Sequence, residues 1–405
     1  MQNDAYLETH QMNGGLTLVQ VRDRYDVAII GAGPAGSAIS RQLALAGLAV
    51  LLVDKASFPR PKVCGCCLSI SALSHLRALG LDDIPGTLAA VPLKRLLVAA
   101  GPGGRLSLPL QTSVSISRSA LDAAMVAKAM EAEVQFCDET TACIAAADGD
   151  QGRIVELHSK EIRKSIRASI VVVADGLGGA AAAKLPALAP VVAEHSHVGT
   201  GAISHCALPF YEAGTIYMAY GEGSYLGLVR LEDGSTDLAA ALDPHLLRSA
   251  GSPSAAATAL IEMSGWPVPR DLHEISWKGT VALTRRRKNV AENRLFVIGD
   301  AASYVEPFTG EGIAWALESA IKLAPLVVRG ARRWDASLIW HWQHIYRRTV
   351  VRRQRPTRYV AAILHNAPAA IVAANLLNAV PALIRPLVSA VHGDTTREGN
   401  HACHH

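Results

Sequence analysis

Apolar runs near the start of the chain predict two neighbouring parallel strands. Residues 27–30 and the run that ends at Asp54 are almost entirely apolar, which is typical of strands that are covered on both faces of a sheet. A glycine-rich turn and a helical pattern lie between the two runs. Residues 25–55 are therefore predicted to form a strand, a helix and a second strand.

Along the rest of the chain the pattern alternates between helical and strand-like segments. Helices are predicted at 71–79 and 117–132, and the last part of the chain is mostly helical in pattern. Short runs bounded by turn residues predict strands, including a hairpin around 101–104 and a buried strand at 169–174. Further strands between 195 and 283 predict a second, largely antiparallel sheet.

Together these elements predict an α/β fold with two domains and C-terminal helices. The first domain is a Rossmann-like nucleotide-binding unit, and the second is a largely antiparallel β-sheet domain for the substrate. The predicted boundaries are a flexible arm at 1–24, a discontinuous first domain at 25–92, 115–185 and 290–330, a sheet domain at 93–114 and 190–285, helices at 331–392 and a disordered tail at 393–405.

Composition narrows the class of protein. The net charge of +4, from 39 Lys and Arg against 35 Asp and Glu, is small for 405 residues and gives no case for a nucleic-acid partner. Seven scattered cysteines, and no basic-then-apolar leader before Tyr25, indicate a cytoplasmic protein. The apolar region 361–391 is interrupted by polar residues and prolines, so it is predicted not to cross a bilayer but to be able to lie against one.

The first candidate site is the turn after residues 27–30. Gly31, Gly33 and Gly36 have the spacing that allows a tight turn, a close approach of backbone to pyrophosphate, and packing of helix on strand. The phosphates would meet the N-terminus of the following helix, which favours negative charge. Asp54 follows the next strand, where a carboxylate accepts hydrogen bonds from ribose hydroxyls and disfavours a 2′-phosphate. The segment is predicted to bind an ADP moiety.

A second candidate site follows the apolar run at 294–298. Asp300 would lie at the carboxyl edge of a buried strand, where open α/β sheets bind ligands. Gly310, Glu311 and Gly312 would open a long apolar helix. Its N-terminus would stabilise negative charge on the ring of a reduced flavin.

These motifs resemble the FAD-dependent oxidoreductase superfamily of aromatic hydroxylases, flavin halogenases and geranylgeranyl reductases. The resemblance covers roughly residues 24–330 and implies a Rossmann-like FAD-binding domain with FAD as cofactor. The segment Lys62-Val63-Cys64-Gly65 and the late Pro307–Ile313 segment are similar to the geranylgeranyl reductase branch in particular. The residues that the resemblance assigns to FAD are Gly31, Gly33, Ala35, Gly36, Asp54, Lys55, Lys62, Arg118, Asp175, Gly299, Asp300, Pro307, Gly310, Gly312 and Ile313.

The chain also departs from these families. The Asp175-Gly176 pair does not continue into the usual serine and arginine, so its part in recruiting pyridine nucleotide is in doubt. Only a fragment of the halogenase tryptophan motif is present, at 266–269, so halogenation is disfavoured. The substrate segment of the reductases is matched only in part, by Tyr225-Leu226-Gly227.

Three cysteines give the candidate catalytic groups. Cys64, Cys66 and Cys67 lack the paired spacing of a zinc site, and no metal site is predicted. They are interpreted instead as small side chains that line the flavin and leave room for substrate, and basic neighbours would lower a thiol pKa. The catalytic candidates are Cys64, Cys66 and Tyr225.

Histidines and arginines leave further alternatives open. His195, His197 and His205 would share one face if a single strand carried all three, and a structural role is favoured for them. Basic residues gather at 285–288 and 347–358. A solvated face is the simpler interpretation, and the alternative is a dock for an acidic carrier protein, an anionic substrate or a membrane surface.

The resemblance leads to three hypotheses for function. The first is a monooxygenase that uses NADPH or NADH and oxygen to hydroxylate a hydrophobic, aromatic or polyketide-like molecule. The alternative is a reductase of carbon–carbon double bonds in an isoprenoid or related lipid, with a cysteine or tyrosine as proton donor. A flavin halogenase or a flavin-binding protein without turnover comes last.

Overall fold

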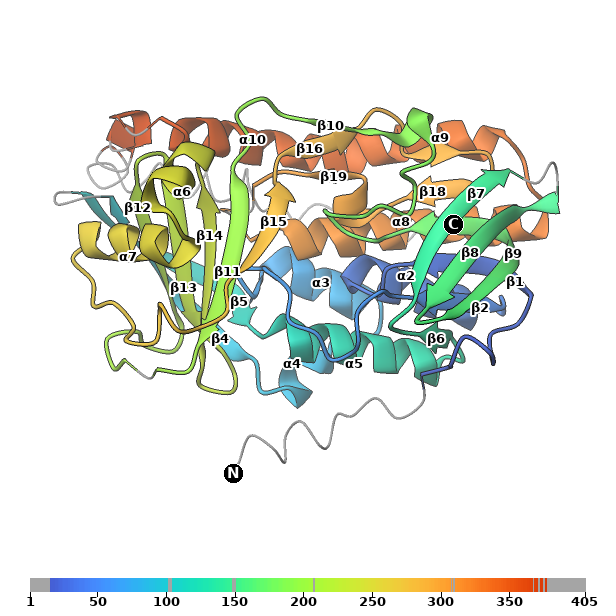
Figure 1. The fold of residues 1–405 in the computed structure, drawn as a ribbon, viewed down its shortest axis with the longest axis horizontal. Helices are drawn as coiled ribbons and strands as arrows, with labels where there is room; N and C mark the ends of the chain where they lie inside the picture. The colour runs from blue at the N-terminus through green and yellow to red at the C-terminus, as the bar shows by residue number, and fades with distance from the viewer. Residues whose placement is uncertain are drawn as a thin grey trace, which may run out of the picture.

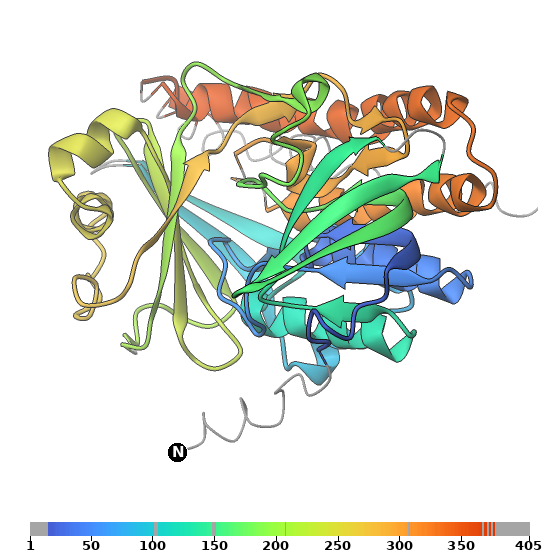
Figure 2. The same cartoon turned by 45° about the vertical axis from the view of Figure 1, so that its right-hand side comes forward.

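Two eight-stranded sheets organise the part of the chain that the computed structural model describes (Figure 1). That part comprises residues 15–100, 104–147, 151–206, 208–306, 308, 310–366, 368–370, 372–373 and 376. The first sheet lies among helices, and the second stands beside it with two short helices on its outer face (Figures 1 and 2).

The first sheet has a parallel core in the order β17-β18-β9-β1-β2-β6. Its parallel pairs join β18 to β9, β9 to β1, β1 to β2 and β2 to β6. The pairs β7–β8, β8–β9 and β17–β18 are antiparallel. The bounds are β1 (Arg24–Ile30), β2 (Val50–Val53), β6 (Gln135–Cys137), β7 (Thr141–Ala147), β8 (Arg153–Ser159), β9 (Ile162–Val173), β17 (Ala291–Glu292) and β18 (Leu295–Val297).

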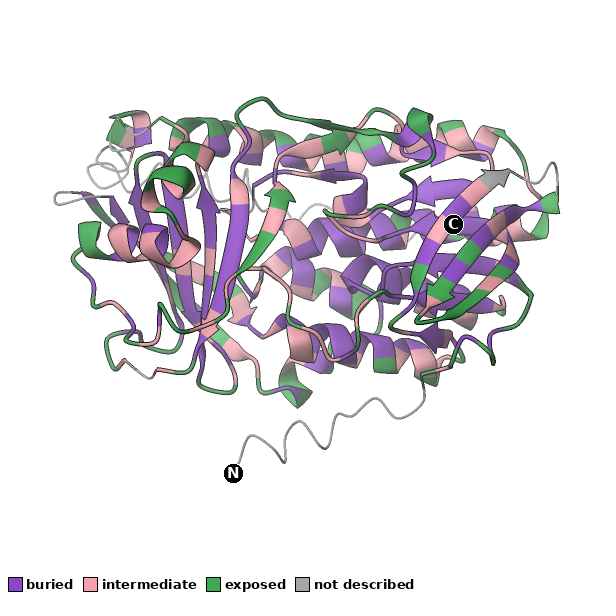
Figure 3. Cartoon of the chain, viewed as in Figure 1, coloured by how far each residue is buried: buried purple, intermediate pink, exposed green. Residues whose placement is uncertain are grey.

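Helices cover the first sheet because each presents an apolar side to it (Figure 3). Helix α2 (Pro34–Leu45) packs against both α5 (Arg118–Glu131) and α8 (Gly312–Arg332), and α3 (Ile70–Ala78) packs against α8. Serine side chains cap two of these helices: Ser69 accepts a hydrogen bond from the third residue of α3, and Ser117 does the same for α5. The short helix α4 (Ile84–Thr87) precedes the crossing to the second sheet.

The second sheet runs in the order β15-β11-β14-β13-β12-β4-β5-β3. All of its neighbours are antiparallel except the parallel pair β12–β4. Its bounds are β3 (Cys67–Leu68), β4 (Val91–Ala100), β5 (Gly104–Ser115), β11 (Val198–Ser204), β12 (Thr215–Gly221), β13 (Ser224–Arg230), β14 (Thr236–Leu242) and β15 (Lys278–Ala282).

The two faces of the second sheet have different covers. Apolar side chains such as Leu226 and Leu228 pack on one face with α6 (Pro244–Ala250) and α7 (Pro253–Met263). Tyr220 and Tyr225 belong to a second apolar cluster that includes Leu364, near the end of α10 (Arg352–Leu364). This second face therefore looks toward the C-terminal helices and the loops of the first sheet.

The remaining elements connect the two sheets. A three-stranded sheet joins β10 (Pro190–Val192), β16 (Arg285–Arg287) and β19 (Ser303–Tyr304). Two short 3-10 helices are η2 (Pro186–Leu188) and η3 (Gly299–Ala301), and helix α9 (Ser337–Tyr346) runs through the π-helical η4 (Arg347–Val351) into α10. These C-terminal helices extend across both sheets along one side of the molecule (Figure 1). Within the described residues, no helix combines the length and apolarity that a bilayer crossing requires.

The predicted fold class is confirmed, with three local differences. Leu18 and Val21 are buried in the core, so residues 15–24 pack on the first domain rather than forming a flexible arm. Strand β9 begins at Ile162, earlier than expected, because it pairs with β8 before it reaches β1. Strand β11 covers only 198–204, so it does not contain His195, His197 or His205. The predicted disordered tail lies outside the described residues.

Candidate functional site

The turn between β1 and α2 requires glycine at two positions. A Cβ on Gly36 would lie 1.8 Å from the carbonyl oxygen of Gly31. Gly31 has a φ of +104°, and a Cβ there would lie 2.3 Å from the carbonyl oxygen of Ala174, at the end of β9. A side chain would not fit at either position. Glycine therefore allows the N-terminus of α2 to lie close to the ends of β1 and β9, as expected of a phosphate-binding turn.

Asp54 is held beside this turn by backbone donors. One carboxylate oxygen accepts from the amide of Ala32 at 2.8 Å, and the other accepts from the amide of Ala56 at 3.0 Å. Lys55 is exposed next to it. The carboxylate thus lies at the carboxyl end of β2, against the glycine turn, where the sequence predicts the ribose.

Two arginines bring positive charge to the same turn. Arg118 donates two hydrogen bonds to the buried Asp122, at 2.9 and 2.8 Å. Arg60 lies between Asp122 and Asp54, at 3.4 and 3.5 Å. A Cβ built on Gly33 would have guanidinium nitrogens of Arg60 and Arg118 at 3.8 and 3.9 Å.

An unpaired buried donor supports an anionic ligand here. Nε of Arg60 is buried and has no hydrogen-bond partner among the described residues. A buried donor of this kind calls for an acceptor. A diphosphate between the helix N-terminus and the two guanidinium groups would satisfy it, and the residues present therefore fit the pyrophosphate of FAD.

The glycine turn after β1 and the Gly299-Asp300 segment lie next to each other. A Cβ on Gly299, whose φ is +61°, would lie 3.1 Å from the Cβ of Ala35 in the first turn of α2. Asp300 follows at the carboxyl end of β18. Burial raises the pKa of the Asp300 carboxyl, while the positive charges of Lys62 and Arg118 act to lower it.

Lys62 joins this group from the loop after β2. Burial and the charge of Arg118 lower the pKa of Lys62, whereas the charge of Asp300 acts to raise it. Its ammonium nitrogen would lie 3.0 Å from a Cβ on Gly176. Asp175 lies just after β9 and has one buried oxygen without a hydrogen-bond partner among the described residues, and burial raises its pKa. The residues assigned to FAD from the middle of the chain thus lie beside those from its start and end.

The start of α8 borders the cysteine segment. A Cβ on Gly310, whose φ is +71°, would lie 3.8 Å from the Cβ of Cys67. Gly312 and Ile313 are the first two residues of α8, and Ile313 is buried. Pro307 lies outside the described residues.

Cys64 and Cys66 form a hydrogen-bonded pair of unequal acidity. The hydrogen bond from Cys66, followed by the nearby charge of Arg118, lowers the pKa of Cys64 to about 5 despite burial. The same hydrogen bond, together with burial, raises the pKa of Cys66. The pair therefore favours the thiolate at Cys64 and the protonated thiol at Cys66. Arg118 is the main cation acting on Cys64, in place of the sequence neighbours Arg60 and Lys62.

Tyr225 and Tyr304 extend the site toward the second sheet. Tyr225 is 4% exposed, and its hydroxyl has no hydrogen-bond partner among the described residues. Burial raises its pKa, and the charge of Glu306 adds to this shift. Burial also raises the pKa of Tyr304, and the charges of Asp300 and Cys64 act in the same direction. Both side chains belong to the apolar cluster on the inner face of the sheet.

Several residues of this site were not predicted from the sequence. Asp122 and Arg60 are not among the site residues that the sequence predicts. Tyr304 follows Asp300 closely in the chain, and that spacing was the signal that could have identified it. His197 had been assigned a structural role, and its partner Glu306 lies far from it in sequence.

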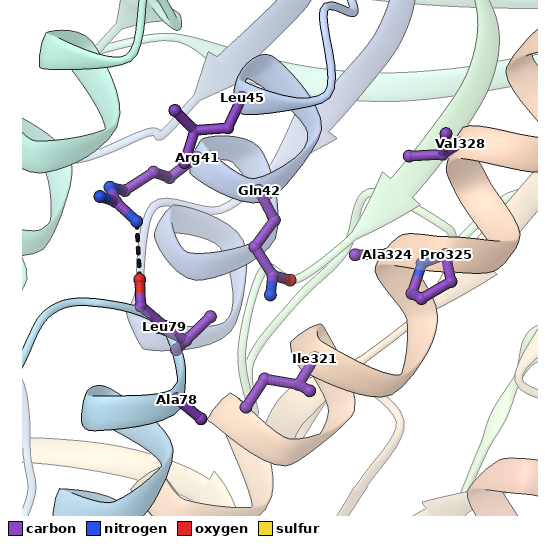
Figure 4. A pocket seen from close by; sticks show the side chains of 9 residues that line it. All are labelled: Arg41, Gln42, Leu45, Ala78, Leu79, Ile321, Ala324, Pro325 and Val328. Atoms are coloured by element: carbon purple, nitrogen blue, oxygen red, sulfur yellow. Dashed lines mark hydrogen bonds between the residues drawn. The ribbon is translucent and has the colours of Figure 1, made fainter. Parts of the chain in front are cut away.

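A pocket of about 540 Å³ lies elsewhere, among the helices α2, α3 and α8 (Figure 4). Arg41 lines it but donates a hydrogen bond to the carbonyl of Leu79 at 2.7 Å. The other lining side chains are mostly aliphatic. It borders the C-terminal half of α2, whereas the phosphate turn is at the other end of that helix, so it is not the candidate site.

Comparison with known proteins places the chain in a family. Residues 24–329 match the family described as FAD binding domain. The chain is 29% identical to digeranylgeranylglycerophospholipid reductase 2 of Methanopyrus kandleri over 72% of this chain and 74% of that protein. It is 28% identical to menaquinone reductase of Mycolicibacterium smegmatis over 78% and 79% of the two chains.

The flavin-dependent brominase Bmp2 has a similar structure, with a TM-score of 0.75 and 19% identity over 92% of this chain and 94% of Bmp2. At that identity the likeness establishes the fold alone. The family match covers most of the chain, so the protein belongs to the FAD-binding-domain family and is a FAD-dependent oxidoreductase.

Proposed function

We propose that this protein is a flavin-dependent reductase of carbon–carbon double bonds in an isoprenoid lipid. The observation that carries the proposal is the similarity, over more than two thirds of the chain, to a digeranylgeranylglycerophospholipid reductase. The menaquinone reductase match points the same way, because menaquinones carry an isoprenoid side chain. These relatives favour the reductase over the hydroxylase, which the sequence analysis had placed first.

The inner face of the second sheet supports an apolar substrate. Tyr220, Tyr225 and Met218 lie there with Phe308 and Leu283 in one apolar cluster. The ring of Phe308 contacts that of Tyr225 edge-on, with centroids 5.3 Å apart. A hydrocarbon chain on this face would bury apolar surface and exclude water from the reacting carbons.

Tyr225 is the proposed proton donor. Its hydroxyl stays protonated at neutral pH because burial raises its pKa, and it has no partner among the described residues that would compete for its proton. Cys64 is a weaker candidate, because its lowered pKa favours the deprotonated form. Cys66 retains its proton and is the second candidate.

The remaining residues hold and orient the cofactor. Gly33, Arg60 and Arg118 would bind the pyrophosphate, Asp54 would bind the adenosine ribose, and Asp300 would bind the ribityl chain. FAD, when bound and reduced, supplies a hydride to the substrate. NADPH or NADH is the proposed source of the electrons.

A basic face supports docking to an anionic membrane. Arg347, Arg348, Arg352 and Arg355 are exposed, and Tyr359 on α10 is 74% exposed. Exposed arginines beside an aromatic side chain favour the headgroup region of an anionic bilayer. The basic residues at 285–288 are less available for docking, because two of them, Arg285 and Arg287, donate hydrogen bonds to backbone carbonyls of this chain.

An anaerobic turnover experiment tests the proposed function. FAD-loaded protein is reduced with NADPH, NADH or dithionite and mixed with digeranylgeranylglyceryl phospholipid or menaquinone in detergent, and products are analysed by mass spectrometry. The expected product carries two added hydrogen atoms for each reduced double bond. Tyr225→Phe should slow product formation while FAD binding is unchanged.

The alternatives give different outcomes. Product that contains added oxygen, and forms only in air, would support the hydroxylase and refute the reductase. Flavin that is not reduced by any of the three reductants would support a binding protein without turnover.

A further inference from the structure

Three side chains from distant parts of the chain converge beside the substrate face. His197 precedes β11, Glu306 follows β19, and His365 follows α10. Nδ1 of His197 lies 2.8 Å from one oxygen of Glu306. Nε2 of His365 lies 3.0 and 3.1 Å from the two oxygens of the same carboxylate. One ligand atom from each residue falls within 4.8 Å of the others.

We propose that His197, Glu306 and His365 form a binding site for a divalent transition-metal ion such as Zn²⁺. Two imidazole nitrogens and one carboxylate oxygen are the protein ligands of several catalytic zinc sites, which leave a fourth position open. The same set excludes Ca²⁺ and Mg²⁺ as natural occupants, because those ions prefer ligand shells made of oxygen. The sequence analysis predicted no metal site, since the three residues have no recognisable spacing.

Burial of the Glu306 carboxylate favours binding of a cation to the cluster. Glu306 is 0% exposed and His197 is 1% exposed. A buried carboxylate is stable only when a positive charge or several donors compensate for lost hydration. A metal ion would supply that charge and displace the protons through which the two rings otherwise donate to Glu306.

The arrangement of the two rings supports metal binding over two separate ion pairs. The imidazole centroids of His197 and His365 are 4.0 Å apart, with ring planes tilted by 35°. Both rings present a nitrogen to the same carboxylate, so one ion can meet all three ligands at once, whereas two separate ion pairs would not require the rings to lie together. Neutral imidazole is the form that coordinates metals.

The site would border the substrate rather than the cofactor phosphates. The ring of Tyr225 lies edge-on to that of His197, with centroids 6.5 Å apart. The fourth position would be available to water or to an oxygen of the substrate headgroup, such as a phosphate or quinone oxygen. A bound cation would also lower the pKa of the nearby Tyr225 hydroxyl, opposite to the effect of Glu306 alone.

The test measures metal content and needs no turnover. The chain also carries His401, Cys403, His404 and His405 near its end, so all proteins in the experiment have these four replaced by alanine or serine. This background protein is purified with EDTA, dialysed against Zn²⁺, and analysed for metal by mass spectrometry. The expected result is one Zn²⁺ per chain.

Variants locate the ion. Glu306→Gln and His365→Gln should each weaken Zn²⁺ binding by more than about tenfold. His365 is half-buried, so its variant guards against a loss caused by misfolding, which FAD binding and circular dichroism also check. His341→Gln is the matched control, because His341 is on α9, outside the cluster, and its Nδ1 lies 2.8 Å from the backbone carbonyl oxygen of Ser337.

Two outcomes would overturn the proposal. One is a background protein that takes up no Zn²⁺, which would leave the cluster a hydrogen-bonded network without a metal. The other is Zn²⁺ that survives Glu306→Gln and His365→Gln but is lost with Cys64→Ser, which would place the ion at the cysteines. This inference does not rest on the proposed reductase activity.

Discussion

Replacing Asp122 with asparagine should destabilise the protein strongly. Asp122 is 0% exposed and accepts two hydrogen bonds from Arg118, which is itself only 6% exposed. Asp122→Asn removes the carboxylate charge that faces both Arg118 and Arg60 in this buried group. Breaking a buried ion pair in this way costs about 3–5 kcal/mol.

Asp83→Asn is the matched control. Asp83 pairs with Lys128, also on α5, at 3.2 Å, but its side chain is 54% exposed. Loss of an exposed pair changes the free energy of unfolding by less than about 1 kcal/mol. The two variants therefore compare the same kind of substitution near the same helix at two depths of burial.

Thermal unfolding of the FAD-free proteins measures the difference, because ligand binding then adds nothing to stability. With a shift of roughly 2 °C per kcal/mol in a chain of this size, Asp122→Asn should lower Tm by about 6–10 °C and Asp83→Asn by less than about 2 °C. Equal Tm values for the two variants would refute the argument that Asp122 compensates for a buried charge.

Three further predictions concern the cofactor turn, the thiolate and the basic face. Gly36→Ala should abolish FAD binding, because its Cβ would lie 1.8 Å from a carbonyl oxygen, whereas Gly86→Ala has no atom within 4 Å and should bind FAD normally in a fluorescence titration. Cys64 should react with iodoacetamide at a rate that rises with pH around 5 and is constant by neutral pH, because the thiol loses its proton above its lowered pKa of about 5; a rise centred near pH 9 in peptide mass spectrometry would contradict this. Charge reversal at the exposed Arg347 and Arg355 should reduce cosedimentation with anionic vesicles in low salt but leave binding to neutral vesicles unchanged, and equal binding to both kinds of vesicle would count against a basic docking face.

Local sequence patterns were sufficient for the elements that bind nucleotide. The strand, glycine turn, helix and acid at 25–55 are consecutive, so their spacing alone indicates their arrangement. Asp54 was predicted beside the turn, and its carboxylate accepts from Ala32 there. The hairpin of β4 and β5 was likewise predicted from two strand-like runs and the turn between them.

Contacts between distant segments could not be predicted in the same way. His197 lies just before β11, and its nearest partners are Glu306 and His365. These three positions share no sequence pattern that could predict their contact. They come together only because α10 packs over the second sheet. Asp122 was visible in sequence, but its role depends on burial beside Arg60, which only the folded chain provides.

Gly299 lies against Ala35, which is synthesised much earlier, so this part of the site can form only late in translation. A ribosome synthesises the phosphate turn and β9 long before Leu295–Val297, the segment that pairs with Val171–Val173. Until then, an entirely apolar stretch of β9 has one unpaired edge, which can associate with another nascent chain. The flavin-binding edge of the first sheet is therefore complete only after β18 and the start of α8 have been synthesised.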